Sequence, residues 1–112
     1  MRVDLSNREL ERYSRQVLLQ AIGFDGQLKI MASHLDVRGE AWAAELALAY
    51  LGAAGADVQD DRQKVGEDKI LVVRSASHMW AMDVLQEEPM ADRIVRLGQL
   101  CTRILLDLAQ GD

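Results

Sequence analysis

The chain has 112 residues, of which 49% are hydrophobic and 28% are charged, so we expect one folded domain rather than a disordered tail. The net charge of −5 and the lack of a basic stripe argue against nucleic acid and against an anionic membrane surface as partners. The single cysteine, Cys101, excludes an internal disulfide and a cysteine-rich zinc site. The N-terminus resembles no signal peptide and the longest apolar stretch is too short to span a bilayer, which predicts a cytoplasmic protein.

The N-terminal segment, residues 5–32, is predicted to be helical. Ser6 and Glu9 form a capping-box pattern, and a helix over residues 5–21 follows from apolar residues at helical spacing. That apolar face consists of Leu10, Tyr13, Val17, Leu18 and Ala21. Residues 22–26 contain two glycines and are predicted to interrupt the helix, and residues 27–32 are predicted to form a short second helix.

The stretch from His34 to Ala56 organises the rest of the chain. It predicts a short strand over 34–37, a tight turn at Gly39 and a helix over about 40–54. This helix is apolar almost all round, so we expect it to be buried on more than one side. Gly55 is suited to end it in the left-handed conformation.

The remaining residues predict alternating strands and helices. Residues 56–67 are acidic and indicate a loop with at most a stub of strand, whereas 69–74 is a β-branched run typical of a buried strand. Ser75 to Ser77 suits the cap of a helix over 78–86, and Pro89 suits the first turn of a last helix. The apolar stripe of that helix is Ile94, Leu97, Leu100, Cys101, Ile104, Leu105 and Leu108.

The predicted fold class is therefore α/β in three layers, with a small, mainly parallel sheet of two to three strands between helices. The predicted organisation is a single domain over 1–112, with a helical segment over 5–32 and a reduced α/β core over 34–112.

Several N-terminal motifs resemble the ubiquitin-activating-enzyme-like superfamily, whose bacterial members are the ThiF, MoeB and HesA adenylyltransferases. Those proteins begin with R-Y-x-R-Q and I-G-x-x-G-Q, followed by a strand, a glycine loop and a helix ending in A-x-x-Y-L-A-x-A-G. The matching residues are Arg12, Tyr13, Arg15, Gln16, Ile22, Gly23, Gly26, Gln27, Ala47, Tyr50, Leu51, Ala54 and Gly55.

The resemblance implies a Rossmann-like homodimer that uses Mg-ATP to adenylate the C-terminal carboxylate of a ubiquitin-like sulfur-carrier protein. It implies that the arginine matching Arg15 reaches across the dimer to the nucleotide phosphates, which the glycine loop holds. An acidic residue after the second strand would hold the ribose, and a D-x-T-D-N segment after a later strand would supply a carboxylate to the metal.

This chain departs from that pattern at the implied nucleotide site. The glycine-loop positions fall on residues 39–44, where only Gly39 remains and Glu40, Trp42 and Ala44 follow. An indole blocks backbone contacts to a phosphate, and a carboxylate repels a polyanion. The D-x-T-D-N positions fall on residues 74–78, which contain no carboxylate for Mg²⁺. The second strand has no clean acidic ending, although Asp60 and Asp61 lie nearby.

Other candidate residues have two interpretations each. Arg15 is either a residual anion contact or an intrahelix partner of Glu11, and we favour the latter. Cys101 lies on an apolar stripe and is expected to be a packed thiol rather than a nucleophile. His34 and His78 have no ligand-spaced partner, so neither is expected to bind a metal, and no catalytic residue or metal site is assigned.

We therefore expect a degenerate, truncated relative of the ThiF/MoeB/HesA family without adenylyltransferase activity and without a cofactor. The expected function is that of a homodimeric binding or regulatory partner in a sulfur-carrier or ubiquitin-like activation pathway. The implied partners are a full-length adenylyltransferase or a ubiquitin-like sulfur-carrier protein. The alternative is an adenylyltransferase that still binds ATP and Mg²⁺ through a remodelled loop.

Overall fold

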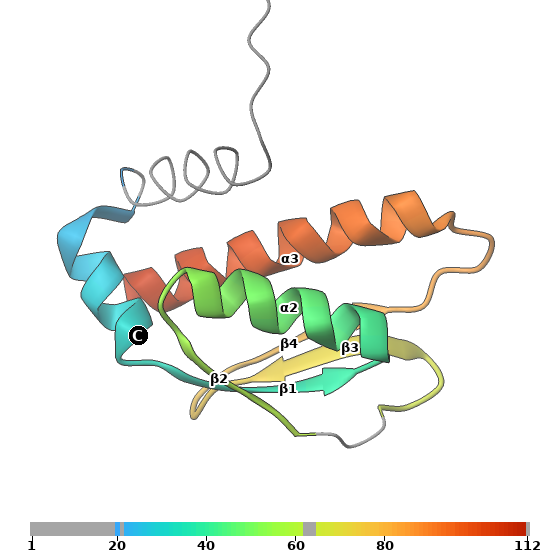
Figure 1. Ribbon diagram of the computed structural model, residues 1–112, viewed down its shortest axis with the longest axis horizontal. Coiled ribbons are helices and arrows are strands. Elements are labelled where there is room, and N and C mark those ends of the chain that lie inside the picture. The colour runs from blue at the N-terminus through green and yellow to red at the C-terminus, as the bar shows by residue number, and fades with distance from the viewer. Residues whose placement is uncertain (1–19, 21, 62–64, 112) are drawn as a thin grey trace, which may run out of the picture.

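The computed structural model describes residues 20, 22–61 and 65–111. Its labelled elements follow the order β1, α2, β2, β3, β4 and α3 (Figure 1). Their bounds are His34–Gly39 for β1, Ala41–Ala53 for α2, Asp57–Asp60 for β2, Lys69–Arg74 for β3, Met79–Asp83 for β4 and Met90–Gln110 for α3. No helix in this part of the chain is long and apolar enough to cross a membrane.

The four strands form one mixed sheet in the order β2-β1-β3-β4. β1 pairs parallel with β2, with Leu35 opposite Val58, and antiparallel with β3, with Val37 opposite Val73. β3 and β4 are also antiparallel. The α/β class is confirmed, but the sheet has more strands than we expected and a single parallel pair, because β3 and β4 form a hairpin instead of being joined by a helix.

The labelled helices lie on one face of the sheet, so the described residues form two layers instead of the expected three (Figure 1). Alternate strand residues enter the core beneath them, whereas the opposite sheet face is polar, with exposed Asp36 and Arg74. The fully buried large side chains are Ile30, Leu35, Val37, Leu51, Ile70, Leu71, Val73, Cys101, Ile104 and Leu105.

Helix α2 buries one side against the sheet through Ala43, Ala44, Ala47 and Leu51. Its flank also packs against α3, where the Tyr50 hydroxyl lies 2.9 Å from the Thr102 Oγ1, whereas Leu46 on the remaining surface is 42% exposed. The helix therefore contacts both the sheet and α3, as expected, although part of its surface is exposed among the described residues. The three small alanines let the helix backbone lie close to the sheet. Gly55 has a φ of 104° after the helix, as expected for a left-handed end.

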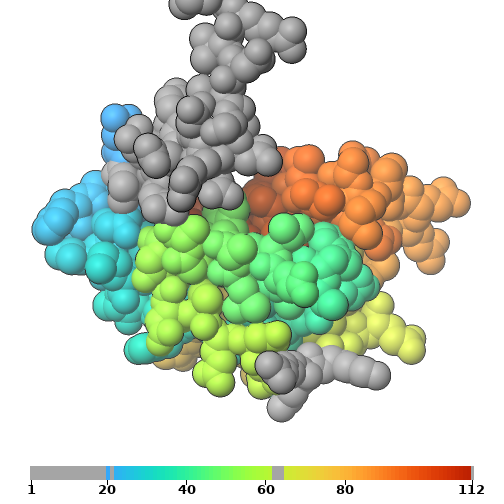
Figure 2. Space-filling view, viewed as in Figure 1, coloured from blue at the N-terminus to red at the C-terminus, as the bar shows by residue number. Residues whose placement is uncertain are grey.

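The helical stretch 22–31 packs across the C-terminal ends of α2 and α3. Gln27 Nε2 donates to the Ala54 carbonyl at 2.9 Å, and a Cβ on Gly26 would be 3.0 Å from the Ala109 Cβ. Residues 22–31 are all helical, so the predicted interruption over 22–26 is wrong, although Gly23 has a positive φ of 72°. Most of the helix predicted over 5–21 lies outside the described residues. In Figure 2 the helical stretch 22–31 is the blue and cyan lobe beside α2.

Residues 78–86 form no helix; strand β4 and part of the loop before α3 occupy them. The Ser75 hydroxyl accepts the His78 N–H at 3.0 Å, as an N-cap would, but the Ser75 N–H also donates to the His78 carbonyl at 2.9 Å. This second bond closes a two-residue hairpin turn between β3 and β4. Ser75 therefore makes the hydrogen bond expected of an N-cap, but it makes it in a β-turn and not at the start of a helix.

Candidate functional site

The connection from β1 to α2, at the position that the family resemblance assigns to phosphate binding, consists of Glu40 alone. Gly39 ends the strand and Ala41 begins the helix. The Glu40 N–H donates to the Ile70 carbonyl on β3 at 3.0 Å, and the Glu40 carbonyl accepts the Ala44 N–H at 2.8 Å. So short a connection holds the helix start directly against the sheet and leaves no loop that could wrap a phosphate chain.

Gly39 is required by a close approach and not by a turn. A Cβ at this position would lie 2.5 Å from the Ile70 carbonyl oxygen and 3.1 Å from the Leu71 Cα. Gly39 is the last residue of β1, opposite Leu71, and it has no positive φ. The predicted order of strand, tight turn and helix is present, but the turn falls on Glu40, and Gly39 ends the strand where its missing side chain makes room for β3.

Glu40 and Trp42 are bonded to each other at the N-terminal end of α2. The Trp42 Nε1 donates to the Glu40 Oε2 at 2.7 Å, and the half-buried indole packs against the core. The Glu40 carboxylate accepts no capping hydrogen bond from the N–H groups of the first helical turn. A negative charge is nevertheless favourable near a helix N-terminus, so the carboxylate supplies the anion that this end attracts. Ala44 is buried behind it and is not placed to contact a ligand.

The parallel pairing of β1 and β2 brings two more carboxylates to the same end of the strands. β2 ends at Asp60, opposite Val37, and the Asp61 N–H donates to the Val37 carbonyl at 2.9 Å. The Arg38 guanidinium forms an ion pair with the Asp61 carboxylate, and both side chains are about one quarter exposed. The structure thus places Asp60 and Asp61 beside the Glu40 connection, where sequence reasoning had found no clean equivalent.

Residues 74–78 lie at the opposite end of the strands, because β3 runs antiparallel to β1. Arg74 pairs with Asp36, and Leu71 with Gly39, so the chain from Leu71 through Arg74 runs away from Gly39 toward the start of β1. This segment therefore cannot face the β1–α2 connection, and its assignment to the metal-binding position of the family is wrong. Pairing direction depends on residues far apart in the chain, and the local pattern of residues 69–74 does not reveal it.

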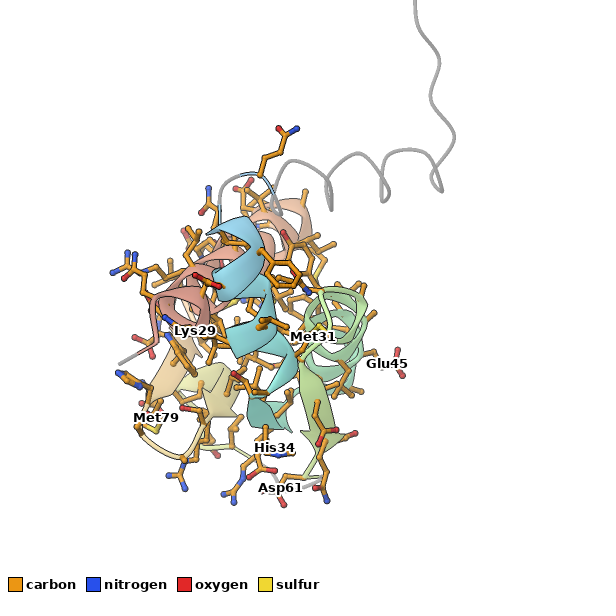
Figure 3. The ribbon with its side chains drawn as sticks, turned by 90° about the vertical axis from the view of Figure 1, so that its left-hand side faces the viewer. Lys29, Met31, His34, Glu45, Asp61 and Met79 are labelled. Atoms are coloured by element: carbon orange, nitrogen blue, oxygen red, sulfur yellow. The ribbon has the colours of Figure 1, made fainter. Side chains whose placement is uncertain are left out.

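A separate open pocket of about 380 Å³ lies at the end of the strands away from the β1–α2 connection. It is lined by residues of three segments, including Lys29, His34, His78, Trp80 and Asp107, and Figure 3 shows Lys29 and His34 at this end of the molecule. The chain thus brings together the two histidines that are distant in sequence. Within the described ranges, no group of three or more His, Cys, Asp or Glu residues is arranged to hold a metal ion.

The polar groups of this pocket already have structural partners. The Trp80 Nε1 donates to Asp107 Oδ2 at 2.9 Å, and the His78 ring stacks on Trp80 with centroids 5.8 Å apart. The His34 Nδ1 lies 2.6 Å from Asp57 Oδ2, and the Lys29 Nζ donates to the Gln110 carbonyl at the end of α3. These contacts tie the hairpin and the helical stretch 22–31 to α3, and the start of β1 to the start of β2.

Two further predicted site residues have different outcomes. Cys101 is fully buried on α3, and burial raises the pKa of its thiol to about 12. It is therefore the packed, unreactive thiol that the sequence predicted. Arg15, the candidate anion contact, lies outside the described residues.

The site is thus that of an α/β domain whose first strand leads directly into a helix at a closed, acidic connection.

Over about half of its length the chain is similar to MoeB-type adenylyltransferases. It is 42% identical over 53 residues to a molybdopterin-synthase adenylyltransferase of Haemophilus influenzae. It is 43% identical over 51 residues to the adenylyltransferase and sulfurtransferase MOCS3 of Aedes aegypti and likewise of Anopheles gambiae. The resemblance to the ThiF/MoeB family is confirmed over this segment.

The chain spans only part of each relative. The aligned segment covers 47% of this chain but 22% of the Haemophilus protein, and 46% of this chain but 12% of each mosquito protein. No family model matches the chain, and no solved structure matches it significantly.

Proposed function

We propose that this chain is a non-catalytic, homodimeric ThiF/MoeB-like protein that acts as a binding or regulatory partner in a sulfur-carrier or ubiquitin-like activation pathway. The observation that carries the proposal is the Glu40–Trp42 pair at the one-residue connection between β1 and α2. A carboxylate and an indole stand where the family resemblance implies a triphosphate. Coulomb repulsion from the Glu40 carboxylate disfavours a polyanion there, whereas the nearby Asp61 carboxylate is paired with Arg38.

The partner in this proposal is a full-length adenylyltransferase or a ubiquitin-like sulfur-carrier protein. The similarity to the relatives supports this choice, because a chain that retains part of such an enzyme's surface can retain its contacts. Titration calorimetry of this chain against a MoeB-type adenylyltransferase, and separately against its carrier protein, measures each contact directly. A heat signal that saturates at one partner per chain supports the proposal, and no heat with either protein contradicts it.

The loss of nucleotide binding has its own test in a thermal melt with millimolar Mg-ATP. A nucleotide at 100 times its Kd stabilises the folded state by about 2.7 kcal/mol, which raises the Tm of a domain of this size by at least several degrees. We expect no rise for this chain. A MoeB-type adenylyltransferase in the same buffer is the positive control.

A second candidate function is an adenylyltransferase that binds ATP through the remodelled connection. It is favoured by the N-terminal end of α2, where the Glu40 side chain makes no capping bond to the helix N–H groups. A rise in Tm with Mg-ATP that is reduced in Arg15→Ala but kept in Arg8→Ala would support this function and contradict the first. Both arginines lie in the same N-terminal segment, so the second variant is the matched control.

A further inference from the structure

The two edges of the sheet differ in how they are protected against pairing with another strand. β2, at one edge, is only four residues long and begins and ends with an aspartate. Short strands and charged side chains are common protections of a sheet edge. Two copies of β2 side by side would also bring like charges close together, which is unfavourable.

β4, at the other edge, lacks this protection over most of its length. Its sequence is MWAMD, in which Met79 is 61% exposed and Ala81 is also exposed. The charge at its end is balanced, because the Lys69 Nζ forms an ion pair with the Asp83 carboxylate. Within the described ranges no strand lies beyond β4.

The backbone of β4 also presents alternate hydrogen-bonding groups away from the sheet. The Ser75 N–H to His78 carbonyl bond closes the hairpin, and hydrogen-bonded and non-hydrogen-bonded pairs alternate from there along an antiparallel ladder. Trp80, opposite Val73, therefore directs its N–H and C=O toward β3. Ala81, the next residue, directs its N–H and C=O outward.

We propose that β4 pairs with β4 of a second copy of this chain, antiparallel and around a twofold axis at Ala81, so that one sheet runs through both copies. The inference rests on the homodimer proposed above and names its interface. An antiparallel pair of identical strands is self-complementary, as a twofold dimer requires. The small, uncharged residue at the centre lets the two strands approach, and the Lys69–Asp83 pair leaves no unbalanced charge beside them.

The first test is a disulfide across the axis. In a hydrogen-bonded antiparallel pair the opposing Cα atoms are about 5.5 Å apart, which is within the range that a disulfide spans. Ala81→Cys should therefore form a covalent dimer on mild oxidation, seen on a non-reducing gel. The unmodified chain is one control, since its Cys101 is buried. Gln59→Cys, an exposed position on β2, is the matched control and should stay uncoupled.

The second test measures mass by light scattering at tens of micromolar. Ala81→Lys places two ammonium groups side by side at the axis, so it should give a monomer with an unchanged circular dichroism spectrum. Gln59→Lys should remain a dimer. An unmodified chain that is monomeric contradicts both the homodimer and the interface. A dimer that persists in Ala81→Lys, with no cross-link in Ala81→Cys, overturns the interface alone. A monomer that pairs through β4 only with a strand of another protein also overturns it.

Discussion

Replacing Gly39 with alanine tests whether close packing of β1 against β3 determines the residue at this position. The added Cβ would lie 2.5 Å from the Ile70 carbonyl oxygen and 3.0 Å from the Leu71 Cδ1. The carbonyl is backbone and cannot rotate away, so the strands must separate. The same movement strains the hydrogen bond from the Glu40 N–H to that carbonyl.

The expected loss of stability follows from these contacts. Overpacking a well-filled site costs about 1–3 kcal/mol, and one weakened backbone hydrogen bond adds about 1 kcal/mol. Alanine recovers roughly 0.5–1 kcal/mol of the conformational entropy that glycine loses in a strand. Gly39→Ala should therefore destabilise the fold by about 2 kcal/mol, a large fraction of the roughly 5–15 kcal/mol typical of a domain.

Urea denaturation followed by circular dichroism measures the effect. With a slope of about 1–2 kcal/mol per molar urea, the midpoint should fall by about 1–2 M. Gly52→Ala is the matched control in the same strand–helix unit, because its Cβ would meet only the Val58 Cγ2 at 3.5 Å. The control should be neutral or more stable by up to about 1 kcal/mol. A Gly39→Ala variant as stable as the unmodified chain would show that the strands do not approach as described.

Two further predictions concern titratable groups. The Arg96 guanidinium donates hydrogen bonds to the Glu88 carboxylate and thereby lowers the pKa of this carboxyl from 4.5. The ionised Glu88 therefore stabilises the fold above about pH 4.5, and this stability is lost as the pH falls through the lowered pKa. Glu88→Gln should thus lower the urea midpoint at pH 7 and flatten its decline below pH 5, and an unchanged decline would contradict the reasoning. The Cys101 thiol, with its pKa raised to about 12, should react with a thiol reagent at pH 8 only after denaturant is added, and rapid labelling of the native chain would refute its burial.

Local patterns in the sequence determined much of the fold. The apolar stripe of α3, the β-branched run of β3, the left-handed Gly55 and the buried Cys101 each follow from residues close together in the chain. Helical spacing and β-branching bias the backbone before tertiary contacts form. The family resemblance was also readable, because it rests on an ordered set of short motifs.

The tertiary structure alone decided how these elements are placed. Residues 78–86 contain good helix formers after a capping serine, but pairing with β3 and the bond from Trp80 to Asp107 hold them as β4 and its following loop. The antiparallel direction of β3 moved residues 74–78 away from the β1–α2 connection. Parallel pairing with β2 brought Asp60 and Asp61 to that connection. Each depends on contacts between residues distant in the chain, which no local pattern encodes.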